Sequence, residues 1–313
     1  MSRIHEALKK AEQDRAVMMP VEPPVLPVKP VEIETNNGNR NPVVTADVHR
    51  KASVIPAPVS EYIRFDDLAA RCAHPRWRPD PNVNVFMSSE LSVHGAEQFR
   101  TLRSRLYQLR GSQPLKKILV TSSLPADGKT FLANNLAQAF VQQPDRRVLL
   151  IDADLRRSRL HVPLGAPTSP GLSEYLRGEA DEMAVIQHGQ EGNLFLIAGG
   201  NEVTDPSELL SNGRLKLLLD RLTPVFDWII MDSPPCLPVA DATALADLCD
   251  GVLLVVRAGS TPLEAAQKAS QELQGRNVLG VVLNAVDKKH AYPHYYGQYG
   301  YTRDEINAKN SQK

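Results

Sequence analysis

The sequence lacks the features that define several large classes of protein. It has only three cysteines among 313 residues, Cys72, Cys236 and Cys249, and none forms a Cys-x-x-Cys pair. Neither a disulfide framework nor a zinc site is therefore expected, and a reducing, cytoplasmic environment fits best. Net charge is also absent, with 36 basic and 36 acidic residues, whereas nucleic-acid-binding proteins normally carry a basic excess. We expect no nucleic-acid partner.

Two kinds of long apolar segment are missing as well. The N-terminus has no apolar core of a signal peptide, and no apolar run approaches the ~20 residues that span a bilayer. The longest runs, such as residues 252–256, have the length of a strand. If the protein works at a membrane, we expect a partner to hold it there.

The chain divides by composition into four segments. Residues 1–17 have apolar side chains at helical spacing and predict an amphipathic helix, which either packs on the domain or docks on a partner. Residues 18–84 are rich in proline and predict a disordered or semi-rigid linker, with an SH3-type ligand as the alternative. Residues 85–290 form the predicted folded domain, and residues 291–313 a polar, tyrosine-rich tail.

Strand-length apolar runs alternate with helical segments in the predicted domain. A helix is expected over residues 97–109, and the expected strands are residues 118–121, 148–151, 194–198, 228–231, 251–256 and 279–283. Runs that are apolar on both faces and separated by helices are typical of an α/β fold. We therefore predict a mostly parallel sheet with helices on both faces.

A phosphate-binding loop is the strongest local signal. From Lys116 to Thr130 the sequence predicts a strand, a tight loop ending in Asp-Gly-Lys-Thr and the start of a helix, although Ser123 replaces the first glycine of the general pattern. Free N–H groups at a helix start bind anionic oxygens. Lys129 is expected to reach the β- and γ-phosphates, and the Thr130 hydroxyl to bind Mg²⁺. The expected nucleotide contacts in this loop are Ser123, Pro125, Ala126, Asp127, Gly128, Lys129, Thr130 and Phe131.

Three aspartates follow predicted strands. Asp152 and Asp154 come just after residues 148–151, and Asp232 just after residues 228–231. Because the carboxyl ends of parallel strands meet at one edge of an open sheet, these carboxylates and the phosphate loop are expected to share that edge. There one acid can hold Mg²⁺ and another can orient or deprotonate a nucleophile. A single aspartate could equally cap a helix, but three beside a phosphate loop indicate ATP–Mg²⁺ binding.

Together these motifs resemble the bacterial tyrosine kinases of capsule and exopolysaccharide synthesis, which are P-loop proteins of MinD/ParA-like fold. The resemblance covers about residues 88 to 301 and rests on three stretches: Ser-Ser-Leu-Pro-Ala-Asp-Gly-Lys-Thr, Ile-Asp-Ala-Asp-Leu-Arg and Ile-Ile-Met-Asp-Ser-Pro-Pro. They match the family's Walker A, A′ and B motifs. The N-terminal Ser-Arg-Ile-His-Glu-Ala-Leu resembles the exosortase-associated, EpsG-type members in particular. Many relatives carry a glycine where this chain has Ala126.

The resemblance implies an ATP- and Mg²⁺-dependent protein-tyrosine kinase that phosphorylates its own tail. We expect Asp154 and Asp232 to position the metal together with Thr130, and Asp152 to orient or deprotonate the incoming tyrosine hydroxyl. Asn284, just after the last predicted strand, is either an adenine contact or an ordinary turn residue. Five of the eight tyrosines lie within ten residues of the tail, and these are the expected acceptors: Tyr292, Tyr295, Tyr296, Tyr299 and Tyr301.

The family also implies partners. Glu97, Arg100 and Arg103 reproduce its E-x-x-R-x-x-R pattern, which in relatives mediates subunit contacts in a ring; without the resemblance this would be a solvated charged helix face. A membrane chain-length-determinant (Wzz-like) protein is the expected activator, recruiting the kinase to the inner face of the plasma membrane. A cognate phosphotyrosine phosphatase is expected to reverse the modification.

Two other interpretations are open. Partitioning ATPases of the MinD/ParA class share the fold and the order of motifs, but they carry a signature lysine at the place of Leu124 and normally lack a tyrosine tail. A nucleotide-gated scaffold would bind ATP to control assembly without useful chemistry. Incubation with labelled ATP and Mg²⁺ separates the three: phosphotyrosine, released phosphate, or neither.

Overall fold

The computed structural model describes residues 63–87, 92–189 and 192–287, which belong to one compact unit, Val59–Lys313. The predicted N-terminal helix, residues 18–62 of the predicted linker and the tyrosine tail lie outside the described residues. Within the described part, no helix has both the length and the apolar character needed to cross a membrane.

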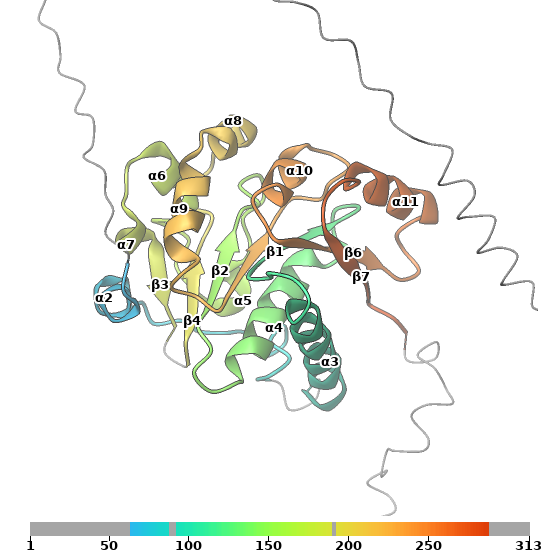
Figure 1. Cartoon of the computed structure of the whole chain (residues 1–313), viewed down its shortest axis with the longest axis horizontal. Helices are drawn as coiled ribbons and strands as arrows, with labels where there is room; N and C mark the ends of the chain where they lie inside the picture. The colour runs from blue at the N-terminus through green and yellow to red at the C-terminus, as the bar shows by residue number, and fades with distance from the viewer. Residues whose placement is uncertain (1–62, 88–91, 190–191, 288–313) are drawn as a thin grey trace, which may run out of the picture. The chain divides into compact units, whose positions relative to one another are not determined.

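A seven-stranded sheet forms the centre of the unit (Figure 1). Its strands lie in the order β3-β4-β2-β5-β1-β6-β7, and all neighbours are parallel except the antiparallel pair β3–β4. Their bounds are β1 Lys117–Ser122, β2 Val148–Asp152, β3 Ile186–His188, β4 Leu194–Ile197, β5 Trp228–Asp232, β6 Gly251–Arg257 and β7 Val278–Asn284. The predicted mostly parallel sheet is confirmed. Strand β3 was not predicted, because three residues carry too little periodic signal.

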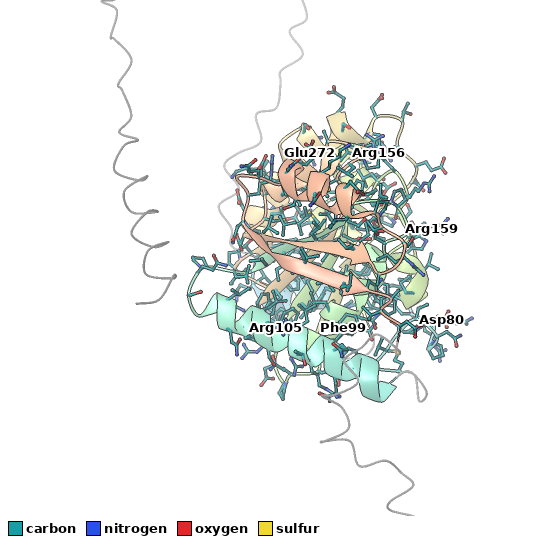
Figure 2. All side chains as sticks on the ribbon, turned by 90° about the vertical axis from the view of Figure 1, so that its right-hand side faces the viewer. Asp80, Phe99, Arg105, Arg156, Arg159 and Glu272 are labelled. Carbon is teal, nitrogen blue, oxygen red and sulfur yellow. The ribbon has the colours of Figure 1, made fainter. Side chains whose placement is uncertain are left out.

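Helices cover both faces of the sheet. They are α2 Phe65–Arg71, α3 Ser92–Arg110, α4 Lys129–Val141, α5 His161–Leu164, α6 Leu172–Arg177, α7 Glu182–Val185, α8 Pro206–Ser211, α9 Arg214–Leu222, α10 Asp241–Ala246 and α11 Leu263–Glu272. Successive side chains of β2 point to opposite faces of the sheet and so belong to two apolar cores. Val148 lies in the core that includes α3, α4 and α5, and Leu149 in the core that includes the other helices. Phe99 and Arg105 mark α3 in Figure 2.

The predicted linker boundary at residue 84 is wrong, because residues 63–84 are folded. They form α2 and the first part of a segment, residues 73–87, which we call the strap; it has no helix or named strand and turns at residues 81–83 and 85–87. Ala73 pairs with Gln187 at the β3 edge, and Trp77 is buried. Proline removes only a backbone donor and suits extended chain, so a proline-rich segment can still pack when it carries buried apolar side chains.

Four buried amide side chains fasten the strap to α4; this amide cluster consists of Asn84, Asn134, Asn135 and Gln138. Asn84 has no exposed surface, and its Nδ2 donates to the carbonyls of Asp80 and Pro163, at 2.7 Å each. Its Oδ1 accepts hydrogen bonds from Asn134 and Gln138. The strap therefore becomes part of the support of the helix that follows the phosphate loop.

Candidate nucleotide site

The phosphate loop, residues 123–128, connects β1 to α4. Its backbone contains two residues in the left-handed region, Ala126 with φ of 69° and Gly128 with φ of 101°. Glycine adopts this region freely, and a Cβ at position 128 would lie 2.0 Å from Nδ2 of Asn284. The loop brings the N-terminus of α4, with its free N–H groups, to the carboxyl edge of the sheet.

Side chains from the end of β6, the loop after it and the end of β7 hold this loop. Asp127 is buried and accepts a hydrogen bond from Oγ1 of Thr261 at 2.6 Å. Nδ2 of Asn284 donates to the Asp127 carbonyl at 2.8 Å, and Nη1 of Arg257 to the Ala126 carbonyl at 3.3 Å. Thr261 and Arg257 were not predicted as site residues, because they are more than a hundred residues away in the chain and carry no local signal. In this structure the amide of Asn284 contacts the loop backbone.

Lys129 lies among the predicted aspartates. Its Nζ is 2.7 Å from Oδ2 of Asp154 and 3.7 Å from Oδ1 of Asp232. Oγ1 of Thr130 donates to Oδ2 of Asp232 at 2.6 Å. Asp152 and Asp232 are register partners at the ends of β2 and β5. The structure thus brings the phosphate-loop lysine and all three strand-end carboxylates to one edge.

Burial dominates the electrostatics of this charged cluster, which we define as Lys129, Asp152, Asp154 and Asp232. Burial, followed by the charge of Asp232, raises the pKa of Asp152 to about 7. Burial also raises the pKa of Asp232 to about 6, against the opposing effects of Lys129 and Thr130. For Lys129, burial lowers the pKa, but Asp232 and Asp154 outweigh it and the net shift is upward. Three acids around one lysine favour the binding of a further cation.

The carboxylate of Asp152 holds the loop that follows it. Its Oδ2 accepts hydrogen bonds from Oγ of Ser158 at 2.7 Å and from the Leu160 amide at 2.9 Å. Its Oδ1 accepts from the Asp154 amide at 3.2 Å, and Oδ1 of Asp154 accepts from the Arg157 amide at 3.1 Å. These bonds fix the backbone of residues 154–160. The sequence predicted the position of Asp152 but not this anchoring contact.

Two buried polar atoms at the site make no hydrogen bond within the described residues, Oγ of Ser123 and Oδ1 of Asp232. Such atoms are costly unless a ligand completes them. A magnesium nucleotide fits, because Mg²⁺ prefers oxygen ligands and usually takes several from phosphates and water. Accordingly, the described chain holds no group of three or more His, Cys, Asp or Glu able to bind a metal ion alone.

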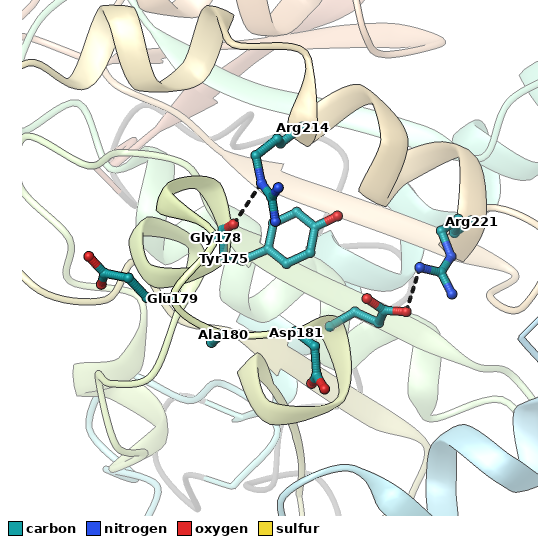
Figure 3. Close-up of a pocket in the computed structure, with 8 residues that line it drawn as sticks. Tyr175, Gly178, Glu179, Ala180, Asp181, Arg214 and Arg221 are labelled. Atoms are coloured by element: carbon teal, nitrogen blue, oxygen red, sulfur yellow. Dashed lines mark hydrogen bonds and ion pairs between the residues drawn. The ribbon is translucent and has the colours of Figure 1, made fainter. Parts of the chain in front are cut away.

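A second hollow of about 350 Å³ lies between α6, α7 and α9 (Figure 3). It is lined by Tyr175, Gly178, Glu179, Ala180, Asp181, Glu182, Arg214 and Arg221. Arg214 lies over the Tyr175 ring, 5.1 Å from its centroid, and Arg221 pairs with Glu182 at 2.7 Å. The acidic and basic groups of this hollow favour neither an anionic nor a cationic ligand, and none of them belongs to the phosphate loop.

The three predicted interface residues on α3 divide into two kinds. Glu97 and Arg100 pair with each other on the surface, with 62% and 45% of their side chains exposed. Arg103 instead donates to the Ala139 carbonyl of α4. Arg103 therefore supports the packing of α3 on the phosphate-loop helix, while the other two are available on the surface.

The fold and the site define a P-loop nucleotide-binding protein of the MinD/ParA type. Residues 118–299 match the family model described as the CobQ/CobB/MinD/ParA nucleotide binding domain. The chain is 35% identical over 228 residues to tyrosine-protein kinase YwqD of Bacillus subtilis (strain 168), covering 72% of this chain and 94% of that protein.

Two further similarities narrow the class. The chain is 37% identical over 202 residues to tyrosine-protein kinase etk of Escherichia coli (strain K12), covering 64% of this chain but only 28% of that protein. The solved kinase domain of Escherichia coli tyrosine kinase ETK aligns with a TM-score of 0.63 at 33% identity, covering 72% of this chain and 87% of that one. The chain belongs to the bacterial tyrosine kinase family, as its motifs predicted.

Proposed function

We propose that the protein is an ATP-dependent protein-tyrosine kinase that phosphorylates tyrosines of its own C-terminal tail. The observation that carries this proposal is the position of Lys129 and Thr130, at the start of α4, beside the carboxylates of Asp154 and Asp232. The 35% identity to a tyrosine-protein kinase over most of that protein supports the reaction class. The five tail tyrosines remain predicted acceptors, since they lie outside the described residues.

Different residues of the site would bind the phosphates and the metal ion. Lys129 and the N–H groups at the start of α4 would hold the β- and γ-phosphates, so ATP competes with Asp154 for the lysine. Thr130, Asp154 and Asp232 would hold Mg²⁺, which neutralises charge on the phosphate oxygens when bound. These contacts would position the γ-phosphate for transfer and neutralise the charge on its oxygens.

Asp152 is the proposed acceptor of the tyrosine proton. A pKa near 7 suits proton transfer at neutral pH. Its side chain is fully buried, however, and Ser158 and Leu160 occupy one of its oxygens. With these hydrogen bonds in place, proton acceptance requires a water molecule that connects Asp152 to the tyrosine hydroxyl.

The proposal is tested by incubating the full-length chain with ATP and Mg²⁺ and analysing its tail by mass spectrometry, with phosphate release measured in parallel. We expect tail phosphotyrosine in the wild type and none in Lys129→Met. Lys117→Met is the control, because Lys117 lies at the opposite end of β1 and pairs with Asp250. Phosphate release alone would indicate a partitioning-type ATPase, and nucleotide binding alone a scaffold. Unchanged phosphotyrosine in Lys129→Met would refute the site.

We also propose the partners that the family implies. Copies of the chain would assemble into a ring through the charged face of α3, and a Wzz-like membrane protein would recruit and activate the kinase at the inner face of the plasma membrane. Each tail phosphate adds roughly −1.5 to −2 charges, so repulsion would loosen the ring until a phosphatase removes them. Arg100→Glu should prevent ring formation in light scattering, and a tail with every tyrosine changed to Phe should keep the ring closed in ATP.

A further inference from the structure

Three arginines within four residues follow the acidic end of β2: Arg156, Arg157 and Arg159. All three are exposed, and Figure 2 shows Arg156 and Arg159 along the same side of the molecule. Arg156 is neutralised, with Nε 2.7 Å from Oδ2 of Asp241 and Nη2 2.8 Å from Oγ of Ser207. Among the described residues, the guanidinium groups of Arg157 and Arg159 have no such partner. The loop therefore carries two uncompensated positive charges.

The charged cluster itself holds this loop in place. Ser158 and Leu160 bond to the buried carboxylate of Asp152, so they face the interior. Arg157 and Arg159 alternate with them and are exposed. The two arginines are thus displayed from a backbone that is fixed relative to the reacting edge of the sheet, which is the preorganisation that a binding element needs.

Guanidinium groups bind carboxylates and phosphates through paired, charge-assisted hydrogen bonds, so the ligand of these arginines is anionic. The phosphates of the nucleotide already have Lys129 and the α4 N-terminus as partners. Apart from Asp152, the proposed acceptor of its proton, the second substrate has no partner assigned, and its tyrosine has to reach this same edge of the sheet. An exposed cationic pair beside the entry favours an acceptor polypeptide with negative charge near its tyrosine.

We propose that Arg157 and Arg159 bind anionic side chains that flank the acceptor tyrosine, either carboxylates or phosphates already placed on neighbouring tyrosines. This inference rests on the proposed kinase function. The reaction is the ordinary transfer: the tyrosine oxygen bonds to the γ-phosphorus, the bond to ADP breaks, and the phenolic proton leaves to the base. With five tyrosines inside ten residues, one phosphotyrosine held by the arginine pair keeps the next tyrosine at the site.

The test uses the full-length protein with saturating ATP and Mg²⁺ and four peptides of equal length. Each has one acceptor tyrosine, flanked by Glu, by phosphotyrosine, by Gln or by Lys. We expect Arg157→Gln/Arg159→Gln to raise the KM of the Glu and phosphotyrosine peptides about tenfold or more, the effect of losing one or two charge-assisted hydrogen bonds. The KM of the Gln peptide and of ATP should stay within about twofold. Charge reversal, Arg157→Glu/Arg159→Glu, should make the Lys peptide the preferred one.

Lys216→Gln/Lys268→Gln is the control for net charge, because it removes two positive charges from exposed positions on α9 and α11, of which Lys216 pairs with Asp220. Binding of Phe-for-Tyr peptides, measured by fluorescence anisotropy, gives a readout that does not depend on turnover. A stronger effect on the phosphotyrosine peptide identifies sequential tail phosphorylation as the source of the anion, and a stronger effect on the Glu peptide identifies acidic substrates.

Equal affinity of all four peptides for the wild-type protein would overturn the inference and leave the kinase proposal intact. A rise in the KM of ATP alone in the Gln variant would also overturn it, since the arginines would then serve the nucleotide. Absence of phosphotyrosine from both tail and peptides, with normal ATP binding, would instead refute the kinase function itself. The three results are distinguishable in one set of assays.

Discussion

Helix α4 adjoins two groups of buried polar side chains that are built on opposite rules. At its N-terminus lies the charged cluster, where three carboxylates surround Lys129 and Oδ1 of Asp232 makes no hydrogen bond within the described residues. Along its flank lies the amide cluster, which is neutral. Asn84 there uses both its amide nitrogen and its oxygen twice, and Asn135 accepts from the Val85 amide at 2.8 Å while donating to two carbonyls.

The buried amide cluster stabilises the fold, whereas the buried charged cluster is arranged to bind a ligand. A fully hydrogen-bonded neutral network specifies one packing arrangement at little electrostatic cost. An excess of buried acids raises carboxyl pKa values and destabilises the ligand-free protein, and a bound cation and nucleotide relieve it. One rule follows for this helix: changes at its start should affect activity more than stability, and changes along its flank the reverse.

The largest effect is expected from Asp232→Asn. Loss of this charge should lower tail phosphorylation about 10²–10³-fold, the range found when one preorganised electrostatic group is removed from a site. The free energy of unfolding of the ligand-free protein should stay the same or rise, because a buried charge that lacks a full set of partners is removed. Activity assays and urea unfolding measure the two quantities. Full activity, or a large loss of stability, would contradict the rule.

Asn84→Ala should show the reverse pattern. It removes the acceptor that Asn134 and Gln138 share, and one donor each from the carbonyls of Asp80 and Pro163, which keep backbone partners. The free energy of unfolding should fall by about 2–4 kcal/mol. The nucleotide affinity of the folded protein should stay near that of the wild type. Asn82→Ala is the matched control: Asn82 is exposed and, within the described part of the chain, its side chain bonds only to Asp80, so its loss should cost less than about 0.5 kcal/mol. Equal losses at both positions would show that the amide cluster does not hold the strap.

The two clusters should also differ in their response to pH, since only one titrates. The pKa of Asp152 is raised from 3.8 to about 7, so the folded state keeps a proton that the unfolded state releases. Stability from this group is complete below about pH 4 and is lost as the pH rises toward 7. Asp154, Asp232 and Lys129 surround it. Between pH 4.5 and 7.5 the free energy of unfolding of Asp152→Asn should therefore fall by about 2 kcal/mol less than that of the wild type, as measured by urea unfolding at each pH.

Asp241→Asn should change the pH dependence of the unfolding free energy in the opposite direction to Asp152→Asn. Burial raises the Asp241 pKa, but hydrogen bonds from Arg156 and Ser207 outweigh it and the net shift is downward. Stability from Asp241 is therefore present above its unfolded pKa and is lost as the pH falls through the folded one. Removing it should reduce the loss of stability in acid, opposite to Asp152→Asn. The same slope in both variants would mean that burial does not govern Asp152.

The predictability of the two clusters from sequence also differs. The strands and the positions of Asp152, Asp154 and Asp232 follow from apolar runs that end in acids, a local pattern. The amide cluster has no local signature: Asn84 lies in a segment whose prolines indicated a linker, and its partners on α4 are 50 or more residues away. The same holds for the contact of Thr261 with Asp127, which joins residues 134 positions apart. Long-range hydrogen bonds depend on the completed fold and leave no periodic trace.

The smallest expected effect tests whether backbone strain also belongs to the start of α4. Ala126 has φ of 69°, a region that costs an L-residue roughly 1–2 kcal/mol and glycine much less. Ala126→Gly should therefore raise the free energy of unfolding by up to about 1 kcal/mol, after the greater chain entropy of glycine is subtracted. Ala265→Gly, the same change in the first turn of α11, should instead lower it by up to about 1 kcal/mol. Urea unfolding of both variants measures the difference. A loss at both positions would mean that the phosphate loop is unstrained, and that only its excess of charge distinguishes it from the flank.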